Sequence, residues 1–429
     1  MSNTIKVGLL GFGTVGTGVL RIIKAHSQKI EKTIGQTFDI TKVLVRQIEK
    51  YQNNEELAHI TLTTNIDDIL NDASIDMVVE VMGSVDIARD YIIRALKAKK
   101  HVVTANKDLI ALHGDELMKL AGQQHCDLYY EASVAGGIPI LRTLVNSMAS
   151  DEIKEVVGIV NGTTNYMLTK MTENGLSYQE ALAQAQALGF AEANPSSDVD
   201  GLDAARKMVI LTRLAFGMQI DLDDITTTGI TQIDREDIQN AKQLGYVIKL
   251  LGTAKEIDEK VYVEVGPVLI KDNHPLSNVQ NENNAVFVVG AAVGKTMYYG
   301  PGAGELPTAN SVVSDMINIA KNMTLQTTGN IFSHYSRQKA LLPKEKIKSP
   351  YYFRLNMLDE TGRFLEMTKI FAEAGASFAK VKQDQVNNDI ASIMIITHPM
   401  SVDMYDKIMD KLSQYEAVTV KLAMKVLEN

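Results

Sequence analysis

The chain has 429 residues, 45% of them hydrophobic, so it is long enough to build two or three hydrophobic cores. Its formal net charge of −9 gives no basic surface for nucleic acid, and no apolar run approaches the ~20 residues of a membrane helix. One cysteine, Cys126, excludes an internal disulfide, no Cys/His cluster has zinc spacing, and the first residues lead into a strand rather than a secretory signal. We therefore expect a multidomain cytoplasmic protein with no nucleic-acid or membrane partner.

A glycine-rich turn joins the first predicted strand, residues 5–10, to a helix. It reads Gly11-Phe12-Gly13-Thr14-Val15-Gly16. Gly11 permits the turn, Gly13 lets backbone approach a pyrophosphate, and Gly16 lets helix and strand pack closely. The N–H groups at the helix start then face the phosphates. We expect a dinucleotide-binding domain of the Rossmann type; a glycine-rich turn without a ligand is the alternative.

Two cations follow the second predicted strand, residues 40–45. Arg46 stands where a site that prefers NAD usually carries an acid for the ribose hydroxyls, and Lys50 lies just beyond. A guanidinium at this position suits the 2′-phosphate of NADP. NADP is therefore the expected cofactor, with NAD as the alternative; an arginine that is simply solvated is the other reading.

Buried strands and helices continue to alternate through residues 77–82, 85–99 and 101–104, which predicts a parallel sheet within residues 1–150. Ligands of such sheets lie beyond the carboxyl ends of the strands. Thr104 ends a strand and Lys107 follows it, so we expect both to reach the cofactor or substrate. A surface lysine that opens the next helix is the alternative.

A charged residue lies in the next predicted strand, residues 127–134. Glu131 has apolar neighbours there, and a Gly136-Gly137 pair follows. A carboxylate among apolar side chains needs a partner. The residues themselves predict no more than a glycine-rich turn that supports a site.

Acids gather before the helix predicted at residues 203–216. A strand at residues 153–160 leads to a helix opened by residues 161–165, and a capping box at residues 177–180 begins another that stops at Gly189. The chain then passes through Glu192, Asp198 and Asp200. These carboxylates favour a polar pocket.

Lys207 lies in the middle of the apolar face of the helix at residues 203–216, while Thr212 and Arg213 point away from that face. Asp203 precedes it by four residues, the spacing at which a carboxylate and an ammonium meet. An inward charge beside several acids favours a lysine that faces a polar pocket. An ordinary ion pair that reaches water is the alternative.

The later strands, residues 261–270, 284–292 and 296–299, predict an open antiparallel or mixed sheet. A second glycine-rich turn containing Gly302 then feeds a helix at residues 308–325, which we expect to return to the nucleotide domain. Residues 333–349 read as a linker. Residues 350–429 follow the order βαββαβ, a ferredoxin-like pattern. Because the linker isolates this module, we expect its removal to leave a folded core.

The stretch from residue 189 to residue 207 resembles the signature of homoserine dehydrogenases, and the Asn106-Lys107 pair resembles a second motif of that family. The resemblance extends over nearly the whole chain. It implies that Glu192 and Asp198 bind the substrate, with Asp203 positioning the site. It also implies that Lys207 binds substrate and works as the acid/base, with Lys107 at the active site.

The same resemblance implies further ligands. A monovalent cation, Na⁺ or K⁺, would be held by the Glu131 carboxyl and backbone carbonyls of Val134, Gly136 and Ile138. Independently of the resemblance, the second glycine-rich helix start predicts that Gly302 lies near the cofactor. The C-terminal module resembles an ACT domain, which implies an amino-acid effector such as threonine and a homodimer or homotetramer, although Thr361 stands where such domains often carry proline.

Three domains follow: an NAD(P)-binding domain at residues 1–150, a catalytic and oligomerisation domain of α+β type at residues 151–332, and the ACT-like regulatory domain. The resemblance implies reversible hydride transfer between L-homoserine and L-aspartate 4-semialdehyde in threonine, methionine and isoleucine biosynthesis. Two alternatives remain. An aspartate-semialdehyde dehydrogenase would need a thiolate, for which Cys126 is the candidate. A non-catalytic NADP-dependent sensor with an effector domain would not need Lys207.

Overall fold

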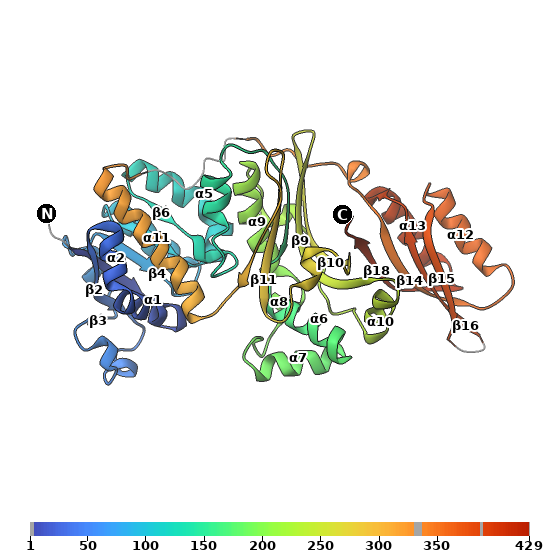
Figure 1. Cartoon of the computed structure of the whole chain (residues 1–429), viewed down its shortest axis with the longest axis horizontal. Helices are drawn as coiled ribbons and strands as arrows, with labels where there is room; N and C mark the ends of the chain where they lie inside the picture. The colour runs from blue at the N-terminus through green and yellow to red at the C-terminus, as the bar shows by residue number, and fades with distance from the viewer. Residues whose placement is uncertain (1–3, 330–336, 387–388, 429) are drawn as a thin grey trace. The chain divides into compact units, whose positions relative to one another are not determined.

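A computed structural model of the chain describes residues 4–329, 337–386 and 389–428 (Figure 1). Contacts between its residues form two compact units, each assembled from three separate stretches of chain. The first unit contains the chain up to Val156, Arg206–Asp224 and Asn284–Lys339. The second contains Val157–Ala205, Ile225–Asn283 and Ala340–Asn429. Strand β7 (Ile153–Ile159) carries the chain from the first unit into the second, and helix α9 (Leu202–Phe216) carries it back.

The first unit is built on a six-stranded parallel sheet, as its alternating strands and helices predicted. The strand order is β3-β2-β1-β4-β5-β6. The strands are β1 (Thr4–Leu10), β2 (Thr37–Leu44), β3 (Thr61–Thr63), β4 (Met77–Glu80), β5 (His101–Thr104) and β6 (Leu128–Tyr129). All described strand pairs of this sheet run in parallel, so their carboxyl ends meet at one edge.

Helix α11 (Glu305–Leu325) packs against α1 (Thr14–Ala25) within this unit (Figure 1). A Cβ atom at Gly18 of α1 would lie 2.7 Å from the Glu305 carbonyl oxygen, so only glycine allows the two helices to approach this closely. Val19, Val312 and Met316 fill the core between them with no exposed surface. The remaining helices of the sheet include α2 (Ser27–Ile34), α4 (Asp86–Lys97) and α5 (Lys107–Gln124).

One strand of the first unit is shorter than predicted. We expected residues 127–134 to form a strand, but β6 ends at Tyr129 and Glu131–Ser133 form a 3₁₀ turn. The reason lies in Glu131, whose side chain and backbone N–H both bond to groups outside the sheet. The carboxylate therefore follows the strand end instead of lying within the strand.

The second unit is organised on an extended mixed sheet. Its strands lie in the order β9-β10-β18-β14-β16-β15, with the short β8 (Thr226–Thr227) beside β10. They are β9 (Tyr246–Ile257), β10 (Lys260–Lys271), β14 (Tyr351–Leu358), β15 (Phe378–Gln385), β16 (Ile390–Thr397) and β18 (Val418–Val426). The helices are α6 (Gly162–Asn174), α7 (Tyr178–Ala187), α8 (Ser196–Val199), α10 (Arg235–Gln243), α12 (Arg363–Glu373) and α13 (Val402–Gln414). Strand β9 and helix α10 were not predicted.

The C-terminal stretch has the expected βαββαβ order, in which α12 and α13 pack on the sheet through Phe353, Phe371 and Ile408. Its last strand also pairs with β10: Leu269 lies opposite Val426, and the Leu427 N–H donates to the Leu269 carbonyl at 2.8 Å. The C-terminal stretch and the part of the second unit that contains β10 therefore share one sheet.

A buried charge cluster and a pair of bridging hydrogen bonds add to this shared sheet. Arg354 of β14 is 4% exposed in its side chain and lies 2.7 Å from both Asp234 and Asp237 at the start of α10. In the predicted linker, residues 333–336 lie outside the described part of the chain. Beyond them, Val261 donates to Ala340 and accepts from Leu342, each at 2.9 Å. These contacts argue against the expectation that residues 350–429 can be removed without affecting the rest of the second unit.

Candidate functional site

The glycine-rich turn between β1 and α1 has the geometry that its three glycines predicted. Gly11 adopts φ = +98°, and a Cβ at Gly16 would lie 2.4 Å from the Gly11 carbonyl oxygen. At Gly13, the N-cap of α1, a Cβ would meet no atom within 4 Å. Gly11 and Gly16 are therefore required by the turn itself, whereas the space beside Gly13 is open to a ligand.

A cavity of about 560 Å³ opens beside this turn at the carboxyl ends of β1, β2 and β4. Five of the expected cofactor residues line it: Gly11, Phe12, Gly13, Arg46 and Lys50. Its wall also includes Tyr51, which the sequence did not single out. Tyr51 packs edge-on against the Phe12 ring at 5.7 Å and donates a hydrogen bond to the Phe12 carbonyl at 3.0 Å. The sequence signal that could have indicated Tyr51 was its position directly after Lys50.

Thr104 is placed to support the sheet edge. It has no exposed surface, and its hydroxyl donates to the Glu80 carboxylate at 2.6 Å while accepting from the Asn106 N–H. Glu80 is also fully buried, and desolvation raises the pKa of its carboxyl. Asn106 caps helix α5 by accepting from the Leu109 N–H at 3.1 Å. These contacts fix the point at which Lys107 leaves the sheet.

Helices α5 and α9, which carry the expected site lysines Lys107 and Lys207, contact each other within the first unit. Lys107 opens α5 and is about one-third exposed, with its ammonium 3.6 Å from Asp108. Arg206, which directly precedes Lys207 on α9, lies 3.1 Å from the Asp108 carboxylate. Farther along, Arg213 donates to the Ile110 carbonyl at 3.2 Å. The start of α5 and the middle of α9 therefore lie side by side, and each contributes a lysine.

Helix α9 corrects one expectation. Thr212 and Arg213 were predicted to point away from the apolar face, but Thr212 is fully buried and Arg213 is 2% exposed. The buried guanidinium of Arg213 is satisfied in this position because it donates to the Ile220 carbonyl at 2.8 Å as well as to Ile110. Lys207, in contrast, is only partly buried. The helix is buried on more of its circumference than its amphipathic pattern indicated.

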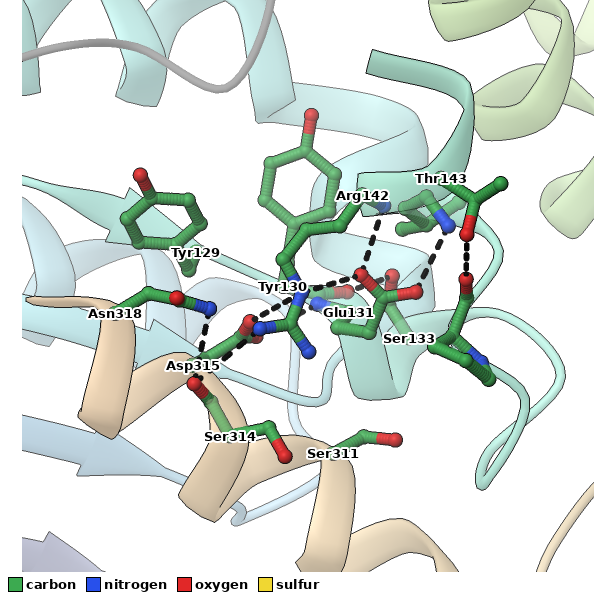
Figure 2. A network of polar contacts seen from close by, with 12 residues as sticks. Tyr129, Tyr130, Glu131, Ser133, Arg142, Thr143, Ser311, Ser314, Asp315 and Asn318 are labelled. Atoms are coloured by element: carbon green, nitrogen blue, oxygen red, sulfur yellow. Dashed lines mark hydrogen bonds and ion pairs between the residues drawn. The ribbon is translucent and has the colours of Figure 1, made fainter. Parts of the chain in front are cut away.

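Glu131 lies at the centre of a buried polar network (Figure 2). Its carboxylate has no exposed surface and accepts from the backbone N–H groups of Leu141 at 2.8 Å and Arg142 at 2.9 Å, and from Arg142 Nε at 3.1 Å. Asp315 of α11 accepts from the Glu131 N–H at 2.8 Å. The guanidinium points between the two acids in Figure 2 and lies 3.6 Å from Asp315 Oδ1.

This network holds two fully buried carboxylates and one guanidinium. Burial raises the pKa of Asp315 to about 8, although Arg142 opposes the shift. Among the described residues, Asp315 Oδ1 has no hydrogen-bond partner. A buried carboxylate oxygen without a donor is a place that a cation could satisfy.

The turn after Glu131 packs against the second glycine-rich turn of the chain. The Gly137 N–H donates to the Pro301 carbonyl at 3.1 Å, and a Cβ at Gly136 would lie 2.4 Å from the Gly302 carbonyl oxygen. A Cβ at Gly302 would itself collide with Asn284. The Gly136 carbonyl accepts from Ser311 Oγ at 2.7 Å, so these glycines allow two turns and the start of α11 to pack together.

The acidic stretch lies in the second unit and is shaped by local hydrogen bonds. Asn194 accepts from the Ser196 hydroxyl at 2.7 Å, which begins the short helix α8. Asp198 lies on α8, and Asp203 lies in the first turn of α9 with 7% of its surface exposed. Glu192 is exposed. Asp200 is exposed as well, so the stretch presents two accessible and two partly or largely buried carboxylates.

Cys126 does not have the surroundings of a nucleophile. The residue is 2% exposed, and burial raises the pKa of its thiol to about 11. A catalytic thiolate needs a lowered pKa and an accessible sulfur. The structure thus disfavours the alternative that depended on Cys126.

A parallel sheet with a glycine-rich first turn, and a cavity edged by two cations at that turn, define a dinucleotide-binding protein of the Rossmann class. The family model described as "Homoserine dehydrogenase, NAD binding domain" matches residues 11–131, and the one described as "Homoserine dehydrogenase" matches residues 139–317. No described helix combines the length and the apolar content that crossing a bilayer requires.

Several known proteins are similar over the whole chain. Homoserine dehydrogenase of Bacillus subtilis is 49% identical over 416 residues, which is 96% of each chain, and that of Lactococcus lactis is 42% identical over 414 residues, also 96% of each. A solved homoserine dehydrogenase structure from Thiobacillus denitrificans has a TM-score of 0.93 and 35% identity, covering 99% of this chain and 98% of its own. The chain belongs to the homoserine dehydrogenase family and is an NAD(P)-dependent oxidoreductase acting on a CH–OH group.

Proposed function

We propose that the chain interconverts L-homoserine and L-aspartate 4-semialdehyde in the cytoplasm, as a step of threonine, methionine and isoleucine biosynthesis, and that it prefers NADP to NAD. The observation that carries the cofactor proposal is the cavity beside Gly13, because Arg46 and Lys50 line it and both can pair with a 2′-phosphate. A hyperthermophilic archaeal homoserine dehydrogenase, 26% identical with a TM-score of 0.64, was solved in complex with NADPH. The nicotinamide, when bound, supplies the hydride chemistry.

Lys207 is the proposed acid and base at the substrate's C4 oxygen. During reduction of the aldehyde its ammonium would donate a proton to that oxygen, and during oxidation its amine would accept one. Lys107 would place a second positive charge beside the same oxygen and stabilise the negative charge that develops there. The contacts of Asp108 with Lys107 and Arg206 support this assignment, because they bring together the two segments that carry the lysines.

The amino group of the substrate is the proposed partner of the acidic stretch. Glu192, Asp198 and Asp203 supply carboxylates, and an ammonium pairs most strongly with a carboxylate that is partly shielded from water. Asp203 precedes Lys207 by one helical turn on α9. It would therefore orient the lysine as well as bind substrate. Thr14, Val15 and Gly16, at the start of α1, would direct N–H groups at the pyrophosphate, with Gly302 bordering the cofactor. Thr104 was expected to reach the cofactor or substrate, but it is fully buried and would instead support the strand end beneath the site.

A monovalent cation, Na⁺ or K⁺, is the proposed ligand of Glu131 together with the carbonyls of Val134, Gly136 and Ile138. Two fully buried carboxyls share the single Arg142 guanidinium, and Asp315 Oδ1, 3.6 Å from that guanidinium, accepts no hydrogen bond from the described residues; both observations support a cation in this region. Oxygen donors of this kind suit hard cations. The three N–H groups that reach the Glu131 carboxylate leave it room for one further partner.

The C-terminal module is proposed to act as an ACT-like regulatory domain that binds an amino acid such as threonine and joins subunits into a homodimer or homotetramer. Its βαββαβ order supports this proposal. So do the apolar side chains that it exposes, which include Leu365 at 59% and Val381 at 43%. Apolar surface of this kind is commonly covered by a partner subunit.

An assay of the purified protein tests the proposal. NADPH absorbance should fall on addition of the semialdehyde, and homoserine should reduce NADP⁺ faster than NAD⁺ at equal concentrations, with and without threonine. Lys207→Met should lower kcat in both directions by roughly 10²–10⁴-fold with little change in NADPH binding. Cys126→Ser is the matched control and should keep its activity. A Lys207→Met enzyme with normal kcat would leave Lys107 as the proton donor.

A further inference from the structure

Asn161 lies where three segments of the second unit meet. It follows β7 and is the N-cap of α6, and it has 4% of its surface exposed. Its side-chain oxygen accepts from the Thr164 N–H and from the Thr164 hydroxyl, both at 2.8 Å. Because the oxygen is held by these donors, the amide nitrogen must point away from α6.

The amide nitrogen donates to two of the proposed substrate-binding acids. Asn161 Nδ2 lies 2.7 Å from Asp198 Oδ1 and 2.9 Å from Asp203 Oδ2. An amide group carries two N–H donors, so each carboxylate takes one of them. Asp198 lies on α8 and Asp203 on α9, and a single nitrogen thereby fixes both carboxylates at one point.

The chemical character of an amide matters at this point. Two carboxylates held this close repel each other, which raises the cost of keeping both ionised. The N–H groups of Asn161 stabilise each negative charge without adding a positive one. A lysine or arginine in the same place would neutralise the charge that an incoming ammonium needs. The amide can therefore hold both carboxylates in place without competing for their negative charge.

We infer that Asn161 is a positioning residue for recognition of the substrate's amino group. It acts through Asp198 and Asp203 and does not touch the reacting C4 oxygen. The inference rests on the proposed function, since it gives those two acids their role. Removing the amide nitrogen should release both carboxylates together, so homoserine binding should weaken while cofactor binding and the fold remain.

The test compares Asn161→Ser with Thr164→Val in the full-length enzyme. Serine keeps an oxygen that can cap α6 but loses both donors to the acids. Thr164→Val removes the hydroxyl that donates to the Asn161 side-chain oxygen. It leaves the hydrogen bonds from Asn161 Nδ2 to Asp198 and Asp203 intact. For Asn161→Ser we expect KM for homoserine to rise at least tenfold and the NADPH dissociation constant to stay unchanged. We expect kcat to fall by a smaller factor than KM rises, because Asp203 still precedes Lys207 by one turn of α9. For Thr164→Val, KM should change less than twofold.

Two further readouts separate positioning from folding. Loss of hydrogen bonds to a carboxylate raises its pKa, so in Asn161→Ser the acid limb of the kcat/KM profile for homoserine should move to higher pH by about one unit. A homoserine analogue without the amino group should react equally well with wild type and variant. Asn161→Asp, which adds a third carboxylate, should show a larger rise in KM than the serine variant.

The results that would overturn the inference are distinct from those that would overturn the function. An unchanged KM in Asn161→Ser, or equal losses of kcat, homoserine binding and NADPH binding, would refute the positioning role. Failure of Asn161→Ser to fold, with Thr164→Val folded, would make the residue structural and refute it as well. A wild-type enzyme that does not oxidise homoserine would instead refute the proposed function.

Discussion

Two glycines of the same turn should respond in opposite ways to an added methyl group. In Gly16→Ala the new Cβ would lie 2.4 Å from the Gly11 carbonyl oxygen, which is fixed backbone. Such overpacking costs about 1–3 kcal/mol. For a unit of this size the corresponding fall in Tm is roughly 2–12 °C. Gly16→Ala is therefore a stability variant.

Gly13→Ala should leave the fold intact and damage only the cofactor site. Gly13 has φ = −91° and ψ = −156°, which alanine can adopt, and its Cβ would meet no protein atom within 4 Å. Replacing a glycine in such a place stabilises the folded state by about 0.4–1 kcal/mol, because the unfolded chain loses freedom. A methyl group in the space proposed for the pyrophosphate should nevertheless raise the NADPH dissociation constant at least tenfold, about 1.4 kcal/mol.

The assay is a fluorescence titration with NADPH beside a thermal melt of the same preparations. The expected pattern is a weakened cofactor with an unchanged or slightly raised Tm for Gly13→Ala, and a lowered Tm for Gly16→Ala. Normal NADPH affinity in Gly13→Ala would mean that the pyrophosphate does not approach this turn. A destabilised Gly13→Ala would mean that the space beside it is occupied by protein.

Three other perturbations follow from the described contacts. Arg46→Ala should weaken NADPH by about 1.5–3 kcal/mol and NADH far less, because a charge-assisted phosphate contact is lost; equal losses in paired titrations would place Arg46 away from the 2′-phosphate. Removing residues 340–429 should lower the Tm of the second unit, because β10 loses its neighbour β18 and Asp237 loses the Arg354 guanidinium. Asp237→Asn should recover part of this loss in the truncated chain, where the carboxylate has no guanidinium beside it. The same substitution should destabilise the full chain. Burial lowers the pKa of Lys249 to about 8, so between about pH 8 and 10.4 the unfolded chain binds one proton more than the folded chain. The free energy of unfolding should therefore rise with pH in this range, compared with the Lys249→Met variant. Parallel curves of unfolding free energy against pH for the two proteins would contradict this reasoning.

The sequence predicted the elements whose signals are local. The glycine turn, the capping box at Ser177 and Glu180 and the βαββαβ order all depend on neighbouring residues, and all were found. It did not predict β9, whose hydrophobic run carries Lys249. That lysine is accommodated only because Asn165 and the Val279 carbonyl, both distant in sequence, accept from it at 2.9 and 2.5 Å.

The sequence could propose residues for the candidate site but not the contacts between them. Spacing indicated Asp203 and Lys207, because four residues make one helical turn. Asn161 contacts residues 37 and 42 positions along the chain, and Tyr51 contacts a residue 39 positions away. Sequence periodicity cannot predict contacts at these separations. The burial of Arg213 likewise depends on Ile110, 103 residues away. Polar partners brought together by the fold are what a single sequence conceals.

The interleaving of the two units constrains how the chain can acquire its structure during synthesis. Helix α11 reaches α1 only after nearly 300 intervening residues, and β10 gains its neighbour β18 only when residues 425 and 426 have left the ribosome. Neither unit can be completed by a growing chain that contains only its first stretch. Contacts this distant in sequence slow folding, and they leave unpaired strand edges exposed in the meantime. Nascent chains of this protein should therefore rely on chaperones more than chains of the same length whose domains are contiguous.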